Sequence, residues 1–402
     1  MSDSTATFTR DSEERRAELA AFVHSAAEAD TLRDHLGRLK RDSVTVMPGG
    51  LAVAQQWCEL NLPPRILLAD LDDEHWPLPM LTALLALCGP TTQVIVTGSS
   101  QDVSLYRALL QLGVTEYLVK PYTLDLLAAT LAKCGGQLMG PEYARMGRTV
   151  AIAGAGGGCG VSTLAMGLSQ LLSQERHLPV ALVDYDRRNG CQLLLSGQTE
   201  DAGLAAVLAS PALDARLLQR AMLQVNARLH LLAQKPELGA PSPVEVDTVL
   251  NLGGTLCRMF NQVVWDLPSY FPAGALEVLT YADLRILVTE LTLQDARNLR
   301  RILHEIGDES EGQRLLLVHN QSRFSGQPPL DRGQFEHIVG RTIDVTLPYA
   351  DRALAQSLSL GAMNVAGAPG FQQGLRQLAD LVSGVPPKPA KKRWYDGLLR
   401  RA

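Results

Sequence analysis

The chain has 402 residues, enough for two or three domains of ordinary size. Its 46% of hydrophobic and 20% of charged residues are typical of a soluble globular protein, and its net charge of −5 argues against a protein that coats nucleic acid. No apolar run approaches the ~18–20 residues of a membrane span, and the polar N-terminus shows no signal peptide. The six cysteines form no C-x-x-C pair, so neither a zinc site nor a disulfide framework is predicted. These features predict a cytoplasmic protein without a specific nucleic-acid partner.

The first third of the chain alternates between strand and helix patterns. After residues 1–16, which are expected to be disordered, five strands are predicted at 19–23, 44–46, 65–70, 93–97 and 114–119. Helices are expected at 29–39, 51–60, 80–87, 105–112 and 124–131. Five β/α repeats predict a doubly wound parallel sheet, in which functional groups collect where strands end.

Three polar residues lie at those strand ends: Asp70, Thr97 and Lys120, the last followed by proline. With this spacing, residues 17–136 resemble a response-regulator receiver domain. The resemblance implies a phospho-acceptor at Asp70, a switch hydroxyl at Thr97 and the family's conserved lysine at Lys120.

One feature of that family is absent. Receivers carry an acidic pair after the first strand to hold Mg²⁺, and this chain has His24 and Ser25 there. The missing carboxylates favour an atypical receiver-like unit that works by protein interaction, with Asp70 capping the next loop. Phosphorylation of Asp70 remains the alternative.

A linker at 137–147, with mixed charge, leads to a second α/β domain expected at 148–384. Here a strand at 150–153 runs into a loop with five glycines in seven residues, starting at Gly154, and then into a helix. The pattern G-x-x-x-x-G-K-[ST] is met at Gly160 and Ser162, but Val161 occupies the lysine position. The loop therefore has the scaffold of a phosphate-binding loop without its main charge.

Acidic residues end two of the later strands. The strand at 179–183 is followed by Asp184, with Asp186 two residues further on, and Gln262–Pro268 contains Asp266. A hydrophobic run that ends in Asp is the arrangement that supports Mg²⁺ or orients the attacking water in P-loop NTPases. Further strands are predicted at 229–232, 284–288 and 314–318, the last leading to Asn320.

The order of these motifs resembles the ParA/MinD family of deviant-Walker ATPases over most of residues 148–384. A receiver-like unit ahead of such a domain, together with the stretch 182–233, is similar to the TadZ/CpaE proteins of Flp (Tad) pilus assembly systems. Carried over by position, the resemblance implies a nucleotide site made of Gly156, Gly157, Gly158, Cys159, Gly160, Val161, Ser162, Thr163, Asn320 and the loop after Pro348. It implies Mg²⁺ held by Ser162 and Asp266, and water activation by Asp184.

Two departures from the family bear on activity. The family has one loop lysine for its own nucleotide and a second that reaches the partner's phosphates across a dimer, and these positions are Val161 and Gly156 here. Cationic contacts of this kind are worth ~10³–10⁵ in rate, so ATP hydrolysis is expected to be very slow or absent. Binding of ATP and Mg²⁺ stays open, because the loop and the metal ligands remain and Arg187 or Arg188 could supply a substitute cation.

Two further features carry hypotheses. Cys159 is interpreted as a small residue tolerated in the loop, with a redox role as the alternative if its pKa were depressed. The C-terminal stretch forms a basic amphipathic pattern that is comparable to the membrane segment of MinD-type proteins. The residues expected to contact a membrane or a partner are Lys391, Lys392, Arg393, Trp394, Leu398 and Leu399.

Together these features predict a dimeric localisation factor for pilus assembly, at the cell pole or peripheral on the inner membrane, that recruits the secretion machinery including its ATPase. An active ATP-driven dimerisation switch is the alternative from the enzyme class. A signalling adaptor regulated at Asp70 is the third hypothesis.

Overall fold

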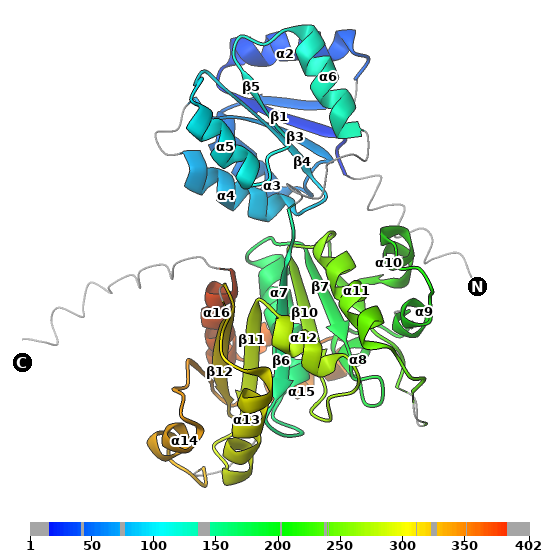
Figure 1. Cartoon of the computed structure of the whole chain (residues 1–402), viewed down its shortest axis with the longest axis vertical. Helices are drawn as coiled ribbons and strands as arrows, with labels where there is room; N and C mark the ends of the chain where they lie inside the picture. Colours follow the sequence, from blue (N-terminus) through cyan, green and yellow to red (C-terminus); the bar gives the residue numbers. More distant parts are fainter. Residues whose placement is uncertain are drawn as a thin grey trace, which may run out of the picture.

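The computed structural model describes residues 16–41, 44–72, 77–135, 145–201, 203–236, 239, 241–310, 312–322, 328–350 and 352–383. The N-terminal segment to residue 15, most of the predicted linker and the basic C-terminal tail lie outside the described residues. The described chain forms two α/β units, each built on its own sheet, stacked one above the other (Figure 1).

The first unit is a five-stranded parallel sheet in the order β2-β1-β3-β4-β5. Its strands are β1 (Leu19–Val23), β2 (Val44–Pro48), β3 (Ile66–Asp70), β4 (Gln93–Gly98) and β5 (Glu116–Val119). Its helices are α2 (Ala26–Arg38), α3 (Gly50–Leu60), α4 (Pro77–Cys88), α5 (Val103–Gln111) and α6 (Leu124–Gly135). Helices α2 and α6 cover one face of the sheet and α3, α4 and α5 the other, which buries both faces and explains the nearly continuous apolar strands (Figure 1).

The second unit has eight strands in the order β13-β12-β11-β6-β10-β7-β9-β8, and only the β8–β9 pair is antiparallel. The strands are β6 (Arg148–Gly154), β7 (Val180–Asp184), β8 (Leu223–Gln224), β9 (Leu229–Leu232), β10 (Gln262–Leu267), β11 (Leu284–Thr289), β12 (Arg314–Asn320) and β13 (Val345–Leu347). The predicted class, two doubly wound parallel-sheet units, is confirmed.

The helices of the second unit form two layers. One layer consists of α7 (Val161–Gln174) and α16 (Pro369–Ser383), which pack against each other and on the sheet. The other consists of α9 (Leu204–Leu208), α10 (Ala215–Ala221), α11 (Val246–Cys257), α12 (Ala275–Tyr281), α13 (Leu293–Ile306) and α14 (Arg332–Val339). Shorter pieces are α8 (Gln192–Leu195), α15 (Ala353–Ser359) and the 3₁₀ turn η1 (Val365–Gly367).

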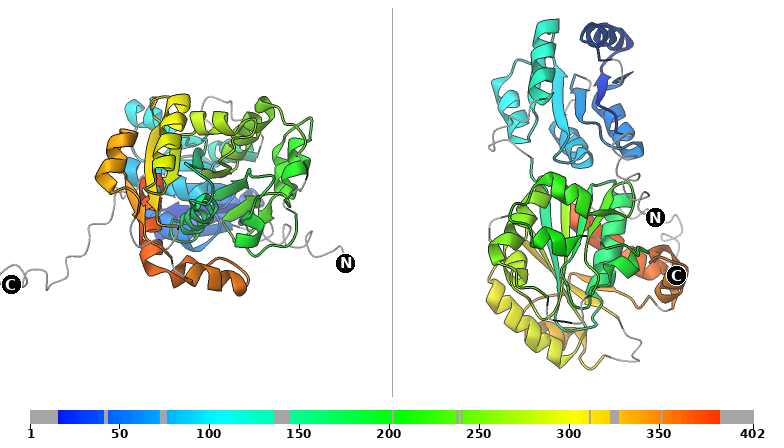
Figure 2. Two further views of the ribbon diagram at one scale, coloured as in Figure 1. Left: turned by 90° about the horizontal axis from the view of Figure 1, so that it is seen from below. Right: turned by 90° about the vertical axis from the view of Figure 1, so that its right-hand side faces the viewer.

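The two units lie one above the other (right view of Figure 2), and their contacts join segments that precede strands. Arg228, which precedes β9, donates from Nη2 to the carbonyl oxygens of Cys58 at 2.5 Å and Asn61 at 2.6 Å in the first unit. Asn261, which precedes β10, donates to the carbonyl oxygen of Ala86 at 2.6 Å. These contacts leave the carboxyl ends of both sheets clear of the interface, and the predicted site residues lie at those ends.

Candidate functional site

The glycine-rich loop connects β6 to α7, as predicted. Gly158 and Gly160 have φ angles of 81° and 91°, a left-handed conformation that strongly favours glycine. Helix α7 begins directly after Gly160, so Ser162 and Thr163 lie in its first turn. The free N–H groups of that turn and the helix dipole favour an anion at the loop.

The predicted acids meet beside this loop because of the strand order. Strand β10 lies between β6 and β7, and its Asp266 pairs in register with Asp184 of β7. The side chain of Ser162 hydrogen-bonds Asp266, and Gln192 donates from Nε2 to Asp266 Oδ2 at 2.7 Å and to the Ser162 carbonyl oxygen at 3.0 Å. Gln192, which the sequence analysis did not single out, therefore joins both predicted metal ligands.

Both carboxyl groups are almost fully buried, with 2% of each residue exposed. Burial, followed by the charge of Asp266, raises the pKa of Asp184 well above its usual range. Burial also raises the pKa of Asp266 to about 6, although hydrogen bonds from Gln192 and Ser162 oppose the shift. A carboxyl group with a raised pKa is a stronger base once it has lost its proton, but a smaller fraction of it is ionised at a given pH.

Carboxylates also lie on the other side of the loop. A Cβ atom on Gly156 would lie 2.9 Å from Oδ1 of Asp295, which is 8% exposed on α13. Ser322 Oγ lies 3.1 Å from the Gly158 carbonyl oxygen and 2.5 Å from Oε1 of Glu290. An acid therefore lies at Gly156, one of the two positions where the family resemblance would place a cation, and Glu290 is linked to the loop through Ser322; no local sequence pattern indicated either acid.

The two arginines considered as substitute cations bind elsewhere. Arg187 donates from Nε to Gln234 at 3.1 Å and from Nη1 to the Ser242 carbonyl oxygen at 2.7 Å. The guanidinium of Arg188 stacks over Tyr270 at 5.4 Å from the ring centroid. In this conformation neither arginine makes a contact with the loop that would replace a lysine.

The remaining nucleotide-site residues lie around the loop. Asn320 donates from Nδ2 to the Cys159 carbonyl oxygen at 2.8 Å, and β13 pairs its Leu347 with Asn320, which places Pro348 nearby. The Cys159 thiol donates to the Gly156 carbonyl oxygen at 3.1 Å, and burial raises its pKa to about 11. That shift is opposite to the depressed pKa that a redox sensor needs, so the structural interpretation of Cys159 is favoured.

These residues fit a nucleotide with Mg²⁺ only in part. The hydroxyl of Ser162 and the carboxyl of Asp266 are hard oxygen donors that already meet, which suits Mg²⁺. The glycine loop and the start of α7 suit phosphate, but the nearby charged groups are carboxylates rather than lysines. The roles carried over for the individual residues remain predictions.

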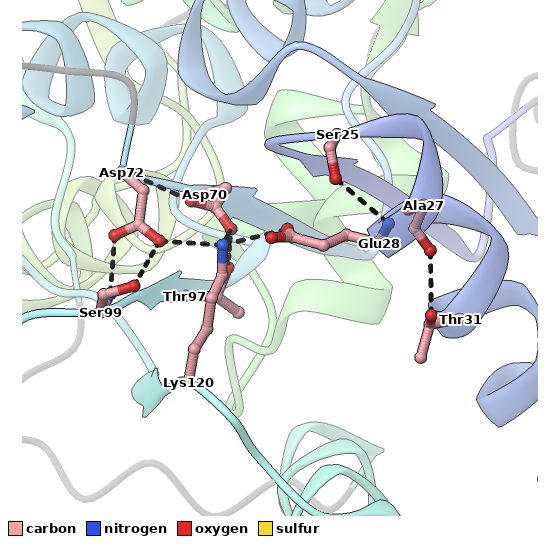
Figure 3. Close-up of polar contacts among 9 residues, drawn as sticks. All are labelled: Ser25, Ala27, Glu28, Thr31, Asp70, Asp72, Thr97, Ser99 and Lys120. Carbon is pink, nitrogen blue, oxygen red and sulfur yellow. Dashed lines mark hydrogen bonds and ion pairs between the residues drawn. The ribbon is translucent and has the colours of Figure 1, made fainter.

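A second constellation assembles in the first unit, and Figure 3 shows its contacts. Asp70 and Thr97 pair in register, and Thr97 donates from Oγ1 to Asp70 Oδ2 at 2.8 Å. Lys120, which follows β5, forms ion pairs with Asp70, with Asp72 at 3.0 Å and with Glu28 at 3.0 Å. Asp70 also accepts the N–H of Asp72 at 2.9 Å, which confirms that it caps the next loop.

The neighbours of Lys120 and Asp72 favour the ionised form of these two groups. Burial alone would lower the pKa of Lys120, but hydrogen bonds to Asp70, Asp72 and Glu28 raise it. Burial alone would raise the pKa of Asp72, but hydrogen bonds from Ser99 and Lys120 lower it. The cation at the centre of these carboxylates is thus an ammonium group supplied by the chain.

The sequence analysis missed Asp72 and Glu28. Asp72 was visible as the second acid after the strand, and Glu28 follows the N-cap residue Ser25 by three positions. The position of Glu28 next to Asp70 depends on how β1 pairs with β3, where Phe22 lies opposite Ala69. That register brings the start of α2 next to Asp70. No group of three or more potential metal ligands with suitable geometry is found in the described part of the chain.

No protein-family model and no curated protein matches this chain. Among solved structures, it is similar to a ParA family ATPase from Chlorobium tepidum, with 24% identity and a TM-score of 0.53 over 58% of this chain and 98% of that one. It is also similar to the cell division ATPase MinD from Pyrococcus furiosus, with 18% identity and a TM-score of 0.50 over 60% of this chain and 100% of that one. The chain therefore contains the fold of the ParA and MinD ATPases.

A third solved structure with similarity to part of this chain is the pilus assembly protein CpaE from Caulobacter crescentus. It has 27% identity and a TM-score of 0.27, and it covers 29% of this chain and 90% of that one. In the described part of the chain, no helix is both long enough and apolar enough to cross a membrane.

Proposed function

We propose that this chain is a localisation and scaffold factor for assembly of a Flp (Tad) pilus, acting as a homodimer through its ParA/MinD-fold unit. In this proposal residues 17–136 form an atypical receiver-like domain that contacts a landmark at the cell pole or on the inner membrane. Residues 148–384 recruit the secretion machinery, including its ATPase. Support comes from the pairing of the two units in one chain and from the sequence resemblance described above.

The proposal treats the nucleotide site as a binding site with little or no turnover. The observation that carries this is the loop itself, with Val161 and Gly156 at the lysine positions and with Asp295 and Glu290 beside it. Charge that develops on a transferring phosphoryl group needs nearby cations, and carboxylates oppose it.

The test is ATP binding and turnover by the full chain with Mg²⁺, compared with Asp184→Ala. The expected result is weak binding, turnover at the level of the buffer, and no difference in turnover between the two proteins. Turnover that disappears in Asp184→Ala would reject the scaffold interpretation and require an active dimerisation switch. A sedimentation measurement with and without ATP tests the dimer separately.

A second function has one specific observation in its favour. Asp70, Thr97 and Lys120 are in contact, as a phospho-acceptor site requires. Against it, Lys120 also binds Asp72 and Glu28, and the acidic pair of the receiver family is missing. Incubation with acetyl phosphate and Mg²⁺, followed by intact mass, tests it: a gain of one phosphoryl group that is lost in Asp70→Asn would establish the signalling function.

The C-terminal residues 385–402 are proposed as a peripheral contact with the inner membrane or with a partner. The support is the sequence pattern of Trp394, Leu398 and Leu399 with basic residues around them. A single short helix of this kind binds weakly, so dimerisation would be needed for stable attachment. Vesicle flotation of the full chain and of a chain ending at 384, with anionic and neutral lipids, checks this.

A further inference from the structure

A cavity of about 650 Å³ lies between the two units. From the first unit it is lined by Arg16, Pro63 and Thr91, which precede strands of that sheet. From the second unit it is lined by residues that precede β7, β9 and β10, among them Arg228 and Phe260. The cavity is therefore at the amino ends of both sheets, at the opposite edge from the glycine loop and from Asp70.

The cavity is strongly basic. Four arginines line it, Arg16, Arg216, Arg220 and Arg228, and none of the described lining residues is Asp or Glu. Arg216 and Arg220 lie one turn apart on α10, which puts them on one face of that helix. Both are exposed, and no carboxylate of the described chain forms an ion pair with either.

The deeper arginine is fixed in place. Arg228 is 7% exposed and donates to the carbonyl oxygens of His177, Cys58 and Asn61, which are neutral acceptors. Burial lowers its pKa, yet the group keeps its charge because guanidinium pKa values are so high. A rigid, uncompensated positive charge at the wall of a cavity favours an anionic ligand.

Another part of the wall is mainly apolar and carries two rings tilted by 53° to each other. The rings of His230 and Phe260 lie 5.3 Å apart between centroids, and Pro63, Pro179 and Met259 lie close by. Burial lowers the pKa of His230 to about 4, so its ring is neutral at pH 7. This wall offers ring and apolar surface against which a base can pack.

We propose that this inter-unit cavity binds a nucleotide carrying one or two phosphates, with the phosphates on the arginines and a base against His230 and Phe260. Its volume lies within the range of about 300–1,000 Å³ found for small-molecule sites, which often form between domains. Arginine is the side chain best suited to phosphate, because its planar donors bind two oxygens together. This site goes beyond the proposed function and is separate from the glycine loop.

Because both units contribute to the wall, the ligand would touch both of them at once. A ligand that binds across an interface stabilises the arrangement in which both halves of its site meet. Nucleotide binding would thus strengthen the contact between the receiver-like unit and the ParA/MinD-fold unit.

The test is titration calorimetry of the full chain, without Mg²⁺, with three probes: AMP, cyclic di-GMP and inorganic phosphate. The decisive variant is Arg216→Glu with Arg220→Glu, and the matched control is Arg297→Glu with Arg301→Glu, two exposed arginines with the same spacing on α13. At least one of the two nucleotides is expected to bind with a stoichiometry near one. The decisive variant is expected to weaken it about tenfold or more, and the control to leave it unchanged.

Several results would overturn the proposal. They are no binding of either nucleotide up to about 1 mM, equal binding by both double variants, or phosphate alone binding as tightly as the nucleotide. Tighter nucleotide binding in Val161→Lys with the stoichiometry still near one would place the probe at the glycine loop and would also reject the cavity. Loss of ATP binding at the glycine loop would leave this test unaffected, so the two proposals can fail independently.

Discussion

The buried carboxylates of the two predicted sites have opposite electrostatic surroundings. In the receiver-like unit, Asp70, Asp72 and Glu28 surround the ammonium group of Lys120, so the charges stabilise one another. In the ParA/MinD-fold unit, Asp184 and Asp266 lie close together. Among the described residues, no basic side chain forms a hydrogen bond or ion pair with either of them, and the pKa values of both are raised. The first site is therefore built around the Lys120 ammonium group, whereas the second is suited to a cation that binds from solution. Mutations can test this difference, and the largest effect is expected where the cation is removed.

Lys120→Met should destabilise the chain by about 3 kcal/mol at pH 7, because it leaves the buried Asp70 carboxylate without its cation, while the more exposed Asp72 and Glu28 stay partly solvated. Urea unfolding measures the change. The matched control is Lys133→Met, whose ion pair with Glu116 leaves 53% of the lysine side chain exposed and should be worth under about 1 kcal/mol. The loss in Lys120→Met should shrink as the pH falls toward 4, because Asp72 then lacks the ammonium group that lowers its pKa and takes up a proton more readily. Equal losses in both variants would contradict the buried cluster.

Val161→Lys should raise ATP affinity about tenfold or more, because it restores a charged donor at the start of α7. Gly156→Lys should have a smaller effect, because its side chain would begin 2.9 Å from Asp295 Oδ1 and would pair with that carboxylate. Titration calorimetry with ATP and Mg²⁺ measures both variants. If Gly156→Lys gave the larger gain, Asp295 would not control the charge at the loop.

Asp266→Asn should stabilise the free chain by about 1–3 kcal/mol at pH 8. The pKa of Asp266 is about 6 in the folded protein and ~3.9 when unfolded, so the folded state binds more protons between these values. The contribution of Asp266 to the free energy of unfolding therefore falls as pH rises through this window. The stabilisation by Asp266→Asn should accordingly vanish near pH 4. Urea midpoints at pH 4, 6 and 8 measure it, with the exposed Asp247→Asn as control. If the stabilisation by Asp266→Asn instead grew toward low pH, the direction of the pKa shift assigned to Asp266 would be wrong.

The smallest effect is expected at Cys159, which should stay unmodified by iodoacetamide at pH 8 in the folded chain. Cys159 is only 3% exposed and the pKa of its thiol is raised to about 11, so little of the reactive thiolate is present at pH 8. Peptide mass spectrometry with a denatured sample as control measures labelling. Rapid labelling of Cys159 in the folded state would revive the redox hypothesis.

The sequence by itself determined most of the strands and the fold class, because buried parallel strands are short apolar runs that local pattern identifies. Asp70, Asp184 and Asp266 could be found for the same reason, since each ends such a run. The glycine loop was equally visible, because its missing side chains are a property of the sequence itself.

Only the tertiary structure shows that Glu28, Gln192 and Asp295 lie beside the predicted sites. Each lies in a helix whose position depends on strand order and register, which local pattern does not contain. The cavity between the units shows the same limit, because Arg216 and Arg228 are far from Arg16 in sequence and meet only when the two sheets stack. Sequence pattern identifies groups at strand ends, whereas the charges that surround those groups are decided by packing between distant elements.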